Sequence, residues 1–191
     1  MTARSAPHEV RVIGGTWKRS KLPVADKPGL RPTPDRVRET LFNWLGHDLS
    51  GWRCLDAFAG SGALGIEAAS RGAAEVVLLE RDRALAQSLA QTCARLKATT
   101  VRVETADALA WMARSEPRRF ELVFIDPPFD AQLFEPALRA AAPLVVDDGW
   151  LYLEADRAYA ADELAPFGLR IHRQARAGAV HFHLLQRGAA G

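Results

Sequence analysis

The sequence has few cysteines and no long run of apolar residues. Its 191 residues include two cysteines, Cys54 and Cys93, whose spacing fits neither a metal site nor a disulfide framework. No uncharged apolar stretch reaches the roughly 18 residues of a membrane span, and residues 1–10 lack the apolar segment of a signal peptide. These absences argue against a disulfide-rich secreted protein, a membrane protein and a metalloprotein. We expect a cytoplasmic protein with reduced cysteines, and the modest size favours a monomer.

Net charge is also small, at +2, but it is unevenly distributed. Residues 1–38 hold nine basic and three acidic side chains, a net +6, and the remainder holds 16 basic and 20 acidic, a net −4. A basic arm on a mildly acidic body is typical of polyanion binding, although a merely solvated segment would look the same. The candidate contacts are Arg11, Lys18, Arg19, Lys21, Arg31, Arg36 and Arg38.

The apolar pattern, with 48% hydrophobic residues, predicts one α/β domain behind a short hairpin arm. The hairpin is expected over 10–13 and 18–24, a proline-rich linker over 27–34, and a helix over 36–45 with Asp35 as its N-cap. Strands and helices then alternate, which predicts a mostly parallel sheet covered on both faces. The strands are expected at 53–58, 75–80, 100–105, 121–126 and 149–155, and the helices at 62–71, 82–97, 107–115 and 131–142.

The chain's last part, 169–176 and 180–187, reads as a hairpin that places an antiparallel final strand at the sheet edge. The predicted organisation is an arm over 1–34, a catalytic domain over 35–187 and a tail over 188–191. Ligands of such sheets bind at the carboxyl ends of the strands.

A glycine-rich stretch, LDAFAGSGALGIEAA, follows the first strand of the domain. Gly60, Gly62 and Gly65 spell the G-x-G-x-x-G of a dinucleotide site. Asp56, however, would repel the pyrophosphate of NAD, at a cost of roughly 3 kcal/mol per charge pair. S-adenosylmethionine carries a sulfonium and an ammonium, so an acid beside the loop favours this cofactor. The competing interpretation of Asp56 is a structural carboxylate that accepts from loop amides.

Two further acids follow the next strands. Glu80 can accept from ribose hydroxyls of either nucleotide. Asp107 can accept from the adenine amine or cap a helix, and these two roles stay open. Phe58, Arg81 and Ala108 adjoin these positions and complete the predicted cofactor site.

The stretch VFIDPPF places Asp126 at the end of a buried strand. Pro127 and Pro128 stiffen the chain and remove N–H donors. The Asp126 carboxylate and the Pro127 carbonyl can then accept both hydrogens of a ring-bound amino group, with Phe129 stacked on the ring. A plain proline-rich strand exit with Phe129 in the core is the alternative.

These motifs together resemble a known family. DAFAGSGALGIEA with DPPF is similar to class I S-adenosylmethionine-dependent methyltransferases that act on exocyclic amines. With RVIGGTWKRSKLPV, GLRPTPDRVRETLFNWL and LLERD, residues 10–187 resemble the bacterial 16S rRNA (guanine-N2)-methyltransferases called RsmD. The resemblance implies a Rossmann-like, seven-stranded, mostly parallel sheet with an antiparallel last strand.

The resemblance also implies a donor, S-adenosylmethionine, and a target, the N2 amine of a guanine in 16S rRNA or a small-subunit assembly particle. It assigns Asp56, Gly60, Gly62, Glu80 and Asp107 to the cofactor, and Asp126, Pro127, Pro128 and Phe129 to catalysis. Methylation of DNA adenine-N6 or of a protein glutamine, and a non-catalytic RNA-binding or assembly role, are the alternatives.

Overall fold

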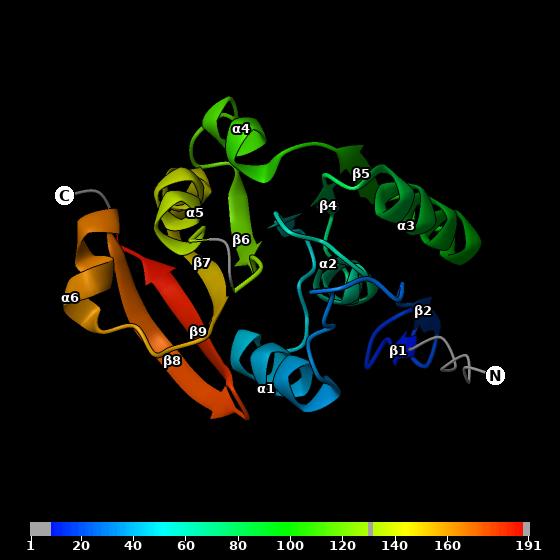
Figure 1. Cartoon of the computed structure of the whole chain (residues 1–191), viewed down its shortest axis with the longest axis horizontal. Coiled ribbons are helices and arrows are strands. Elements are labelled where there is room, and N and C mark those ends of the chain that lie inside the picture. The colour runs from blue at the N-terminus through cyan, green and yellow to red at the C-terminus, as the bar shows by residue number, and fades with distance from the viewer. Residues whose placement is uncertain (1–8, 130–131, 189–191) are drawn as a thin grey trace.

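The computed structural model describes residues 9–129 and 132–188 (Figure 1). The predicted arm and tail therefore extend beyond it, at 1–8 and 189–191. Two short strands and a helix precede the main sheet: β1 (Glu9–Arg11), β2 (Lys21–Pro23) and α1 (Asp35–Leu45). The alternating part follows as β3 (Arg53–Asp56), α2 (Ala63–Ser70), β4 (Glu75–Glu80), α3 (Arg83–Leu96), β5 (Val101–Thr105), α4 (Ala108–Ala113), β6 (Phe120–Ile125), α5 (Phe134–Ala141) and β7 (Val145–Ala155). The described chain ends with α6 (Ala161–Leu164), β8 (Leu169–Ala177) and β9 (Val180–Arg187).

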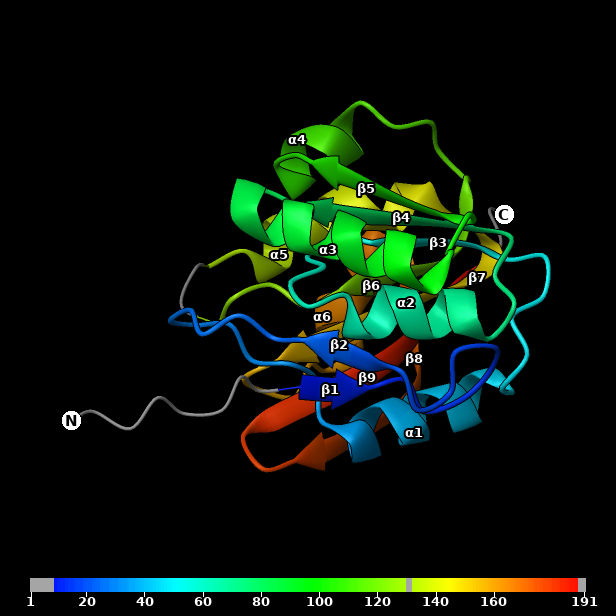
Figure 2. The ribbon, with the colours of Figure 1, turned by 90° about the vertical axis from the view of Figure 1, so that its right-hand side faces the viewer.

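The seven-stranded sheet has the order β5-β4-β3-β6-β7-β9-β8. Strands β3 to β7 are parallel, and β9 is antiparallel to both of its neighbours. Helices α1, α2 and α3 lie on one face, and α4, α5 and α6 on the other (Figures 1 and 2). The predicted fold class, a Rossmann-like mostly parallel sheet with an antiparallel last strand, is confirmed.

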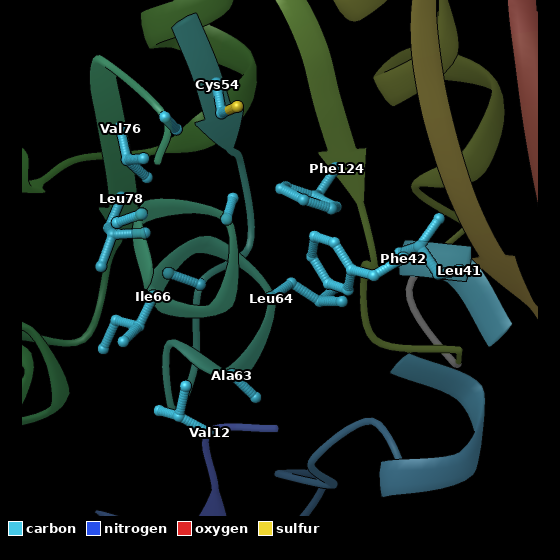
Figure 3. Close-up of a cluster of buried hydrophobic side chains, with 14 of the residues drawn as sticks. Val12, Leu41, Phe42, Cys54, Ala63, Leu64, Ile66, Val76, Leu78 and Phe124 are labelled. Atoms are coloured by element: carbon cyan, nitrogen blue, oxygen red, sulfur yellow. The ribbon is translucent and has the colours of Figure 1, made fainter. Parts of the chain in front are cut away.

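Burial on both faces explains why the central strands are almost continuously apolar. One cluster joins α1, α2 and the sheet, where Phe42 of α1 meets Phe124 of β6 with ring centroids 6.4 Å apart (Figure 3). Val12 of the arm belongs to the same cluster, beside Ala63 of α2 (Figure 3). The arm therefore shares the core of the domain through its apolar side chains.

The two-stranded arm is fixed to α2 by the buried Glu67. The Glu67 carboxylate accepts from the amides of Ile13 and Gly14, each at 2.9 Å. The next residue, Gly15, has φ +77°, and a Cβ there would lie 1.8 Å from the Ser70 carbonyl oxygen. Only glycine fits this close approach, so the IGG stretch is a docking element as well as part of a turn.

Three expectations need correction. The final strand β9 is antiparallel but lies between β7 and β8, so β8 is the edge. The reason is apolar content, because β9 buries Phe182, Leu184 and Leu185 whereas β8 is rich in arginine. Asp35 is not the N-cap of α1 but its first residue, after Pro34. The helix expected over 131–142 begins at Phe134; residue 131 lies outside the described residues.

Candidate active site

The carboxyl ends of the parallel strands meet along one edge of the sheet. Asp56 ends β3, Glu80 ends β4, and Asp126 directly follows β6. Glu154 lies at the same edge, one residue before the end of β7. The predicted acids thus gather where ligands of such sheets bind, with Glu154 as an addition that the sequence interpretation missed.

The glycine loop between β3 and α2 has the backbone that a close ligand requires. Gly60 and Gly62 adopt φ of +53° and +81°, a region that glycine enters without steric cost. The third glycine, Gly65, serves packing instead, since a Cβ there would lie 2.2 Å from Cδ2 of Leu78 on β4. The G-x-G-x-x-G pattern therefore combines two loop glycines with one helix–strand contact.

Asp56 lies under this loop and is 1% exposed. Its Oδ2 accepts from the Gly65 amide at 3.0 Å, so the competing interpretation, a structural carboxylate that accepts from a loop amide, is observed. Its Oδ1 is buried without a hydrogen-bond partner of ordinary geometry among the described residues. Burial raises the pKa of Asp56 to about 7. A buried acceptor left open beside the loop suits a cationic ligand or a bridging water.

The carboxylates of Glu80 and Asp107 both accept hydrogen bonds from backbone amides. The Glu80 carboxylate accepts from the amides of Gly60 at 3.1 Å and Asp82 at 2.9 Å. Asp107 is exposed and caps α4, accepting from the Ala110 amide at 2.9 Å through Oδ1. The capping role of Asp107 is thus observed, and its Oδ2 makes no hydrogen bond within the described residues.

The remaining predicted cofactor positions differ in exposure. Arg81 is exposed, Phe58 is half-buried and Ala108 is buried. They border the same edge of the sheet through the loops after β4, β3 and β5. Because Ala108 is 7% exposed, its side chain offers a ligand little surface.

The DPPF stretch leaves β6 at this edge. Asp126 is half-buried, Pro127 is buried and Pro128 is exposed. Phe129 is 39% exposed and its ring centroid lies 6.1 Å from that of Phe134. Phe129 is therefore not core filler, and its ring remains available to a planar ligand.

A buried polar network adjoins Asp126. The Glu154 Oε1 accepts from the Thr33 hydroxyl at 2.7 Å and from the Tyr152 hydroxyl at 2.8 Å. Burial, and then the neighbouring Glu154 carboxylate, raise the pKa of Asp126 well above its usual range. One signal could have found Glu154: it is the single acid in the apolar part of GWLYLEA, at a strand's carboxyl end.

The linker over 27–34 crosses this edge of the sheet (Figure 2). Leu30 covers the glycine loop, so that a Cβ on Gly60 would lie 3.0 Å from its Cδ1. Lys27 pairs with Asp82 after β4, and Thr33 reaches Glu154. The linker thus touches both the glycine loop and the Asp126 side of the site.

Six of the seven basic candidates are exposed: Arg11, Lys18, Arg19, Lys21, Arg31 and Arg36. Lys21 pairs with Glu9 at 3.0 Å. The prediction for Arg38 is wrong, because its side chain is 0% exposed. Its guanidinium contacts Glu67 at 3.4 Å and Asp35 at 2.6 Å. The charge count could not separate this buried arginine from the surface ones.

Residues 9–129 and 132–188 contain no group of three or more His, Cys, Asp or Glu side chains placed to hold a metal ion. Among the helices in these ranges, none combines the length and apolar character needed to cross a membrane.

Comparison with known proteins agrees with this geometry. The family model described as Conserved hypothetical protein 95 matches residues 10–186. Ribosomal RNA small subunit methyltransferase D of Escherichia coli (strain K12) is 46% identical over 193 residues, covering 98% of this chain and 94% of the relative. The Haemophilus influenzae protein of the same name is 43% identical over 150 residues, covering 77% and 76%. A solved structure, Putative methyltransferase yhhF from Escherichia coli, superposes with a TM-score of 0.82 at 39% identity, covering 96% of this chain and 100% of that one.

The sheet order and the glycine loop define a Rossmann-like methyltransferase. Within that class, the chain belongs to the family of the ribosomal RNA small subunit methyltransferase D proteins. The chain is an enzyme of the transferase class, and its family and fold imply S-adenosylmethionine as methyl donor.

Proposed function

We propose that this protein transfers a methyl group from S-adenosylmethionine to the exocyclic N2 of a guanine in 16S rRNA. The observation that carries the proposal is the Asp126–Phe129 segment, which ends a buried strand in a half-buried carboxylate and an exposed aromatic ring. The curated relatives are named for ribosomal RNA methylation in the small subunit. The substrate is either the rRNA or a small-subunit assembly particle.

The residues at the glycine loop fit the cofactor. The buried Oδ1 of Asp56 is an open acceptor, and an acid here matches the two cationic groups of S-adenosylmethionine. The positive φ angles of Gly60 and Gly62 let the backbone approach the ligand without side chains in between. Glu80, and the free oxygen of Asp107, would accept from the ribose hydroxyls and the adenine amine. The bound cofactor supplies an electrophilic methyl group on a cationic sulfur.

The chain's own contribution to the reaction is orientation and charge placement. The ring-bound amine donates its two hydrogens to the Asp126 carboxylate and the Pro127 carbonyl. These bonds favour a tetrahedral nitrogen whose lone pair faces the glycine loop. Phe129 stacks on the base and fixes its plane. After transfer, the proton of the methylated nitrogen moves to Asp126.

The basic arm is proposed as the RNA-binding extension over 1–34, in front of a catalytic domain over 35–187. Exposed Arg11, Lys18, Arg19, Arg31 and Arg36 would hold phosphates while the target base is turned out of its stack. Such contacts release counterions, so affinity should depend steeply on salt.

The test is methyl transfer from labelled donor to undermethylated small subunits and to naked 16S rRNA, with the product mapped by mass spectrometry. We expect N2-methylguanine, and no product with Asp126→Ala despite native folding and RNA binding. Labelled adenine-N6, labelled DNA or a labelled glutamine peptide would point to the other amine substrates. Retained cellular function of Asp126→Ala would instead support a non-catalytic assembly role.

A further inference from the structure

Glu154 has an unusual environment for an acid. It is 4% exposed and belongs to β7, within the apolar sheet. Its hydrogen-bond donors are neutral: the hydroxyls of Thr33 and Tyr152 both reach Oε1, at 2.7 and 2.8 Å. Within residues 9–129 and 132–188, Glu154 forms no ion pair with a lysine or arginine. A carboxylate buried without a cation is costly, so this position calls for an explanation.

The explanation lies in the neighbouring acid. Ile125 of β6 pairs with Leu153 of the parallel strand β7, so the residues that follow them, Asp126 and Glu154, are neighbours at the carboxyl ends of these strands. The Glu154 carboxylate also contributes to raising the pKa of Asp126. Two carboxylates in contact cannot both be charged at low dielectric, and such pairs hold one proton between them. Because both hydroxyls approach Oε1 of Glu154, its Oε2 is the oxygen left for Asp126.

We propose that Glu154 is a positioning residue that holds the Asp126 carboxyl through one shared proton and is itself fixed by Thr33 and Tyr152. This inference rests on the proposed function and deepens it. With one Asp126 oxygen engaged by Glu154, the other is left to accept from the amine. The pair then carries one negative charge in total.

The shared proton leaves the pair able to complete the reaction. When the methyl–sulfur bond breaks and the methyl–nitrogen bond forms, the nitrogen becomes a cation. Its N–H bond then breaks, its electron pair returns to nitrogen, and the proton bonds to the free Asp126 oxygen. The pair becomes neutral, with one proton on each carboxyl, and releases the second proton to solvent as product leaves. No further co-reactant is required.

Thr33 connects this network to the linker and to α1. It belongs to the linker that joins the basic arm to α1, and its carbonyl accepts from Nε of the buried Arg38 at 3.2 Å. The linker thus ends in a hydroxyl that orients the acid next to Asp126. The seating of the arm and the geometry of the catalytic carboxylate are therefore coupled through one side chain.

The charged and titratable groups facing the pair are few. Asp56 approaches Asp126 from β3, Tyr152 contacts Glu154 from β7, and Arg38 of α1 reaches the Thr33 backbone. Burial raises the pKa of Tyr152 well above its ordinary value, so Tyr152 stays a hydroxyl donor. Glu154 is also one of the charges that raise the pKa of Asp56, so Glu154→Gln weakens the pH dependence due to Asp56 in the same direction as that due to the pair.

The first test separates positioning from packing by kinetics. Glu154→Leu removes the contact, and kcat should fall by about 10- to 100-fold while the KM values for RNA and donor change little. Glu154→Gln can accept from both hydroxyls and donate to Asp126, so it should restore most of kcat. Thr33→Val should lower kcat in the same direction as Glu154→Leu. The matched control is Glu116→Gln, an exposed glutamate in the loop before β6, which should behave as wild type.

The second test detects the shared proton from the pH dependence of Tm and needs no substrate. Burial raises the pKa of both carboxyls in the folded chain, so the pair keeps a proton that the unfolded chain loses above about pH 4. The stability from that proton is complete below about pH 4 and is lost as pH rises through the folded pKa. Glu154→Gln removes one titrating carboxyl, so its Tm should fall less than that of wild type on raising the pH from about 6 to 9.

Three outcomes would overturn the proposal: a folded Glu154→Leu with wild-type kcat, a Glu154→Gln as inactive as Glu154→Leu, or a Tm difference that does not change with pH. If Glu154→Leu does not fold, Glu154→Gln and Thr33→Val still decide. Failure of wild type to methylate any RNA would refute the proposed function alone, because the Tm comparison would still report the shared proton.

Discussion

The attachment of the arm to α2 permits a quantitative prediction about Glu67. Its side chain is 0% exposed and accepts four bonds. Two come from arm amides at 2.9 Å, one from Nε of Arg71 at 2.9 Å, and a longer one from Nη1 of Arg38 at 3.4 Å. Glu67 is thus the counter-charge of a fully buried guanidinium and the acceptor that holds the arm.

Glu67→Gln keeps the volume of this side chain but removes its charge and replaces one acceptor with a donor. Arg38 then stays buried with only the exposed Asp35 as an anionic partner. Removing one partner of a buried ion pair costs about 3–5 kcal/mol. In a chain of this size each kcal/mol lowers Tm by about 2–4 °C. The expected loss of Tm is therefore about 6–20 °C.

The assay is urea unfolding at neutral pH, with a thermal melt of the same samples. The matched control is Glu135→Gln on α5, which breaks a surface pair with Arg139 whose two side chains are each 70% exposed, and should cost less than about 0.5 kcal/mol. A Glu67→Gln loss below about 1 kcal/mol would show that the buried cluster contributes little. The double variant Arg38→Met with Glu67→Leu should recover part of the loss, because it removes both buried charges.

Three further predictions concern the site and the arm. Burial raises the pKa of Asp56 to about 7, so its contribution to stability is complete below about pH 4 and lost as pH rises through about 7. Asp56→Asn should therefore make the free energy of unfolding depend less on pH between about 4 and 7. An unchanged pH dependence would show that Asp56 is charged throughout. Phe129→Ala should lower Tm only slightly, because the ring is partly exposed. It should lower kcat/KM by about 5- to 150-fold through lost base stacking. Wild-type kinetics would place the base elsewhere. The double variant Lys18→Ala, Arg19→Ala should weaken RNA binding, measured by filter binding, and reduce the slope of log K against log salt by about 1–2. The control variant Arg114→Ala, at the end of α4 on the other face of the sheet, should leave both unchanged. Equal effects of the two variants would mean non-specific attraction.

The sequence predicted the sheet well because its central strands are short apolar runs between turn residues. Parallel strands buried on both faces give such runs wherever they occur, so β4 appears with the predicted boundaries, 75–80. Strand order is harder to predict, because β8 and β9 both alternate. The strand with more apolar side chains, β9, lies inside the sheet, and the arginine-rich β8 lies at the edge.

The sequence could place residues at the candidate site where their position follows from the local pattern, and could not where their position depends on partners distant in sequence. Asp126 ends a strand and is visible locally. Glu154 bonds to Thr33, 121 residues away, and Arg38 is buried against Glu67, 29 residues away. A residue-type count treats every arginine alike, so only packing could separate buried Arg38 from exposed Arg36.

The position of β8 at the open edge has a consequence for solution behaviour. An edge strand presents unpaired backbone groups that invite another chain to extend the sheet. Here the edge carries exposed Arg170, Arg173 and Arg176, and an irregular register between Ile171 and Arg173 interrupts its ladder. Like charges would face each other if two copies met along this strand. Replacing these arginines with threonine should therefore lower the concentration at which the protein aggregates, without weakening the fold itself.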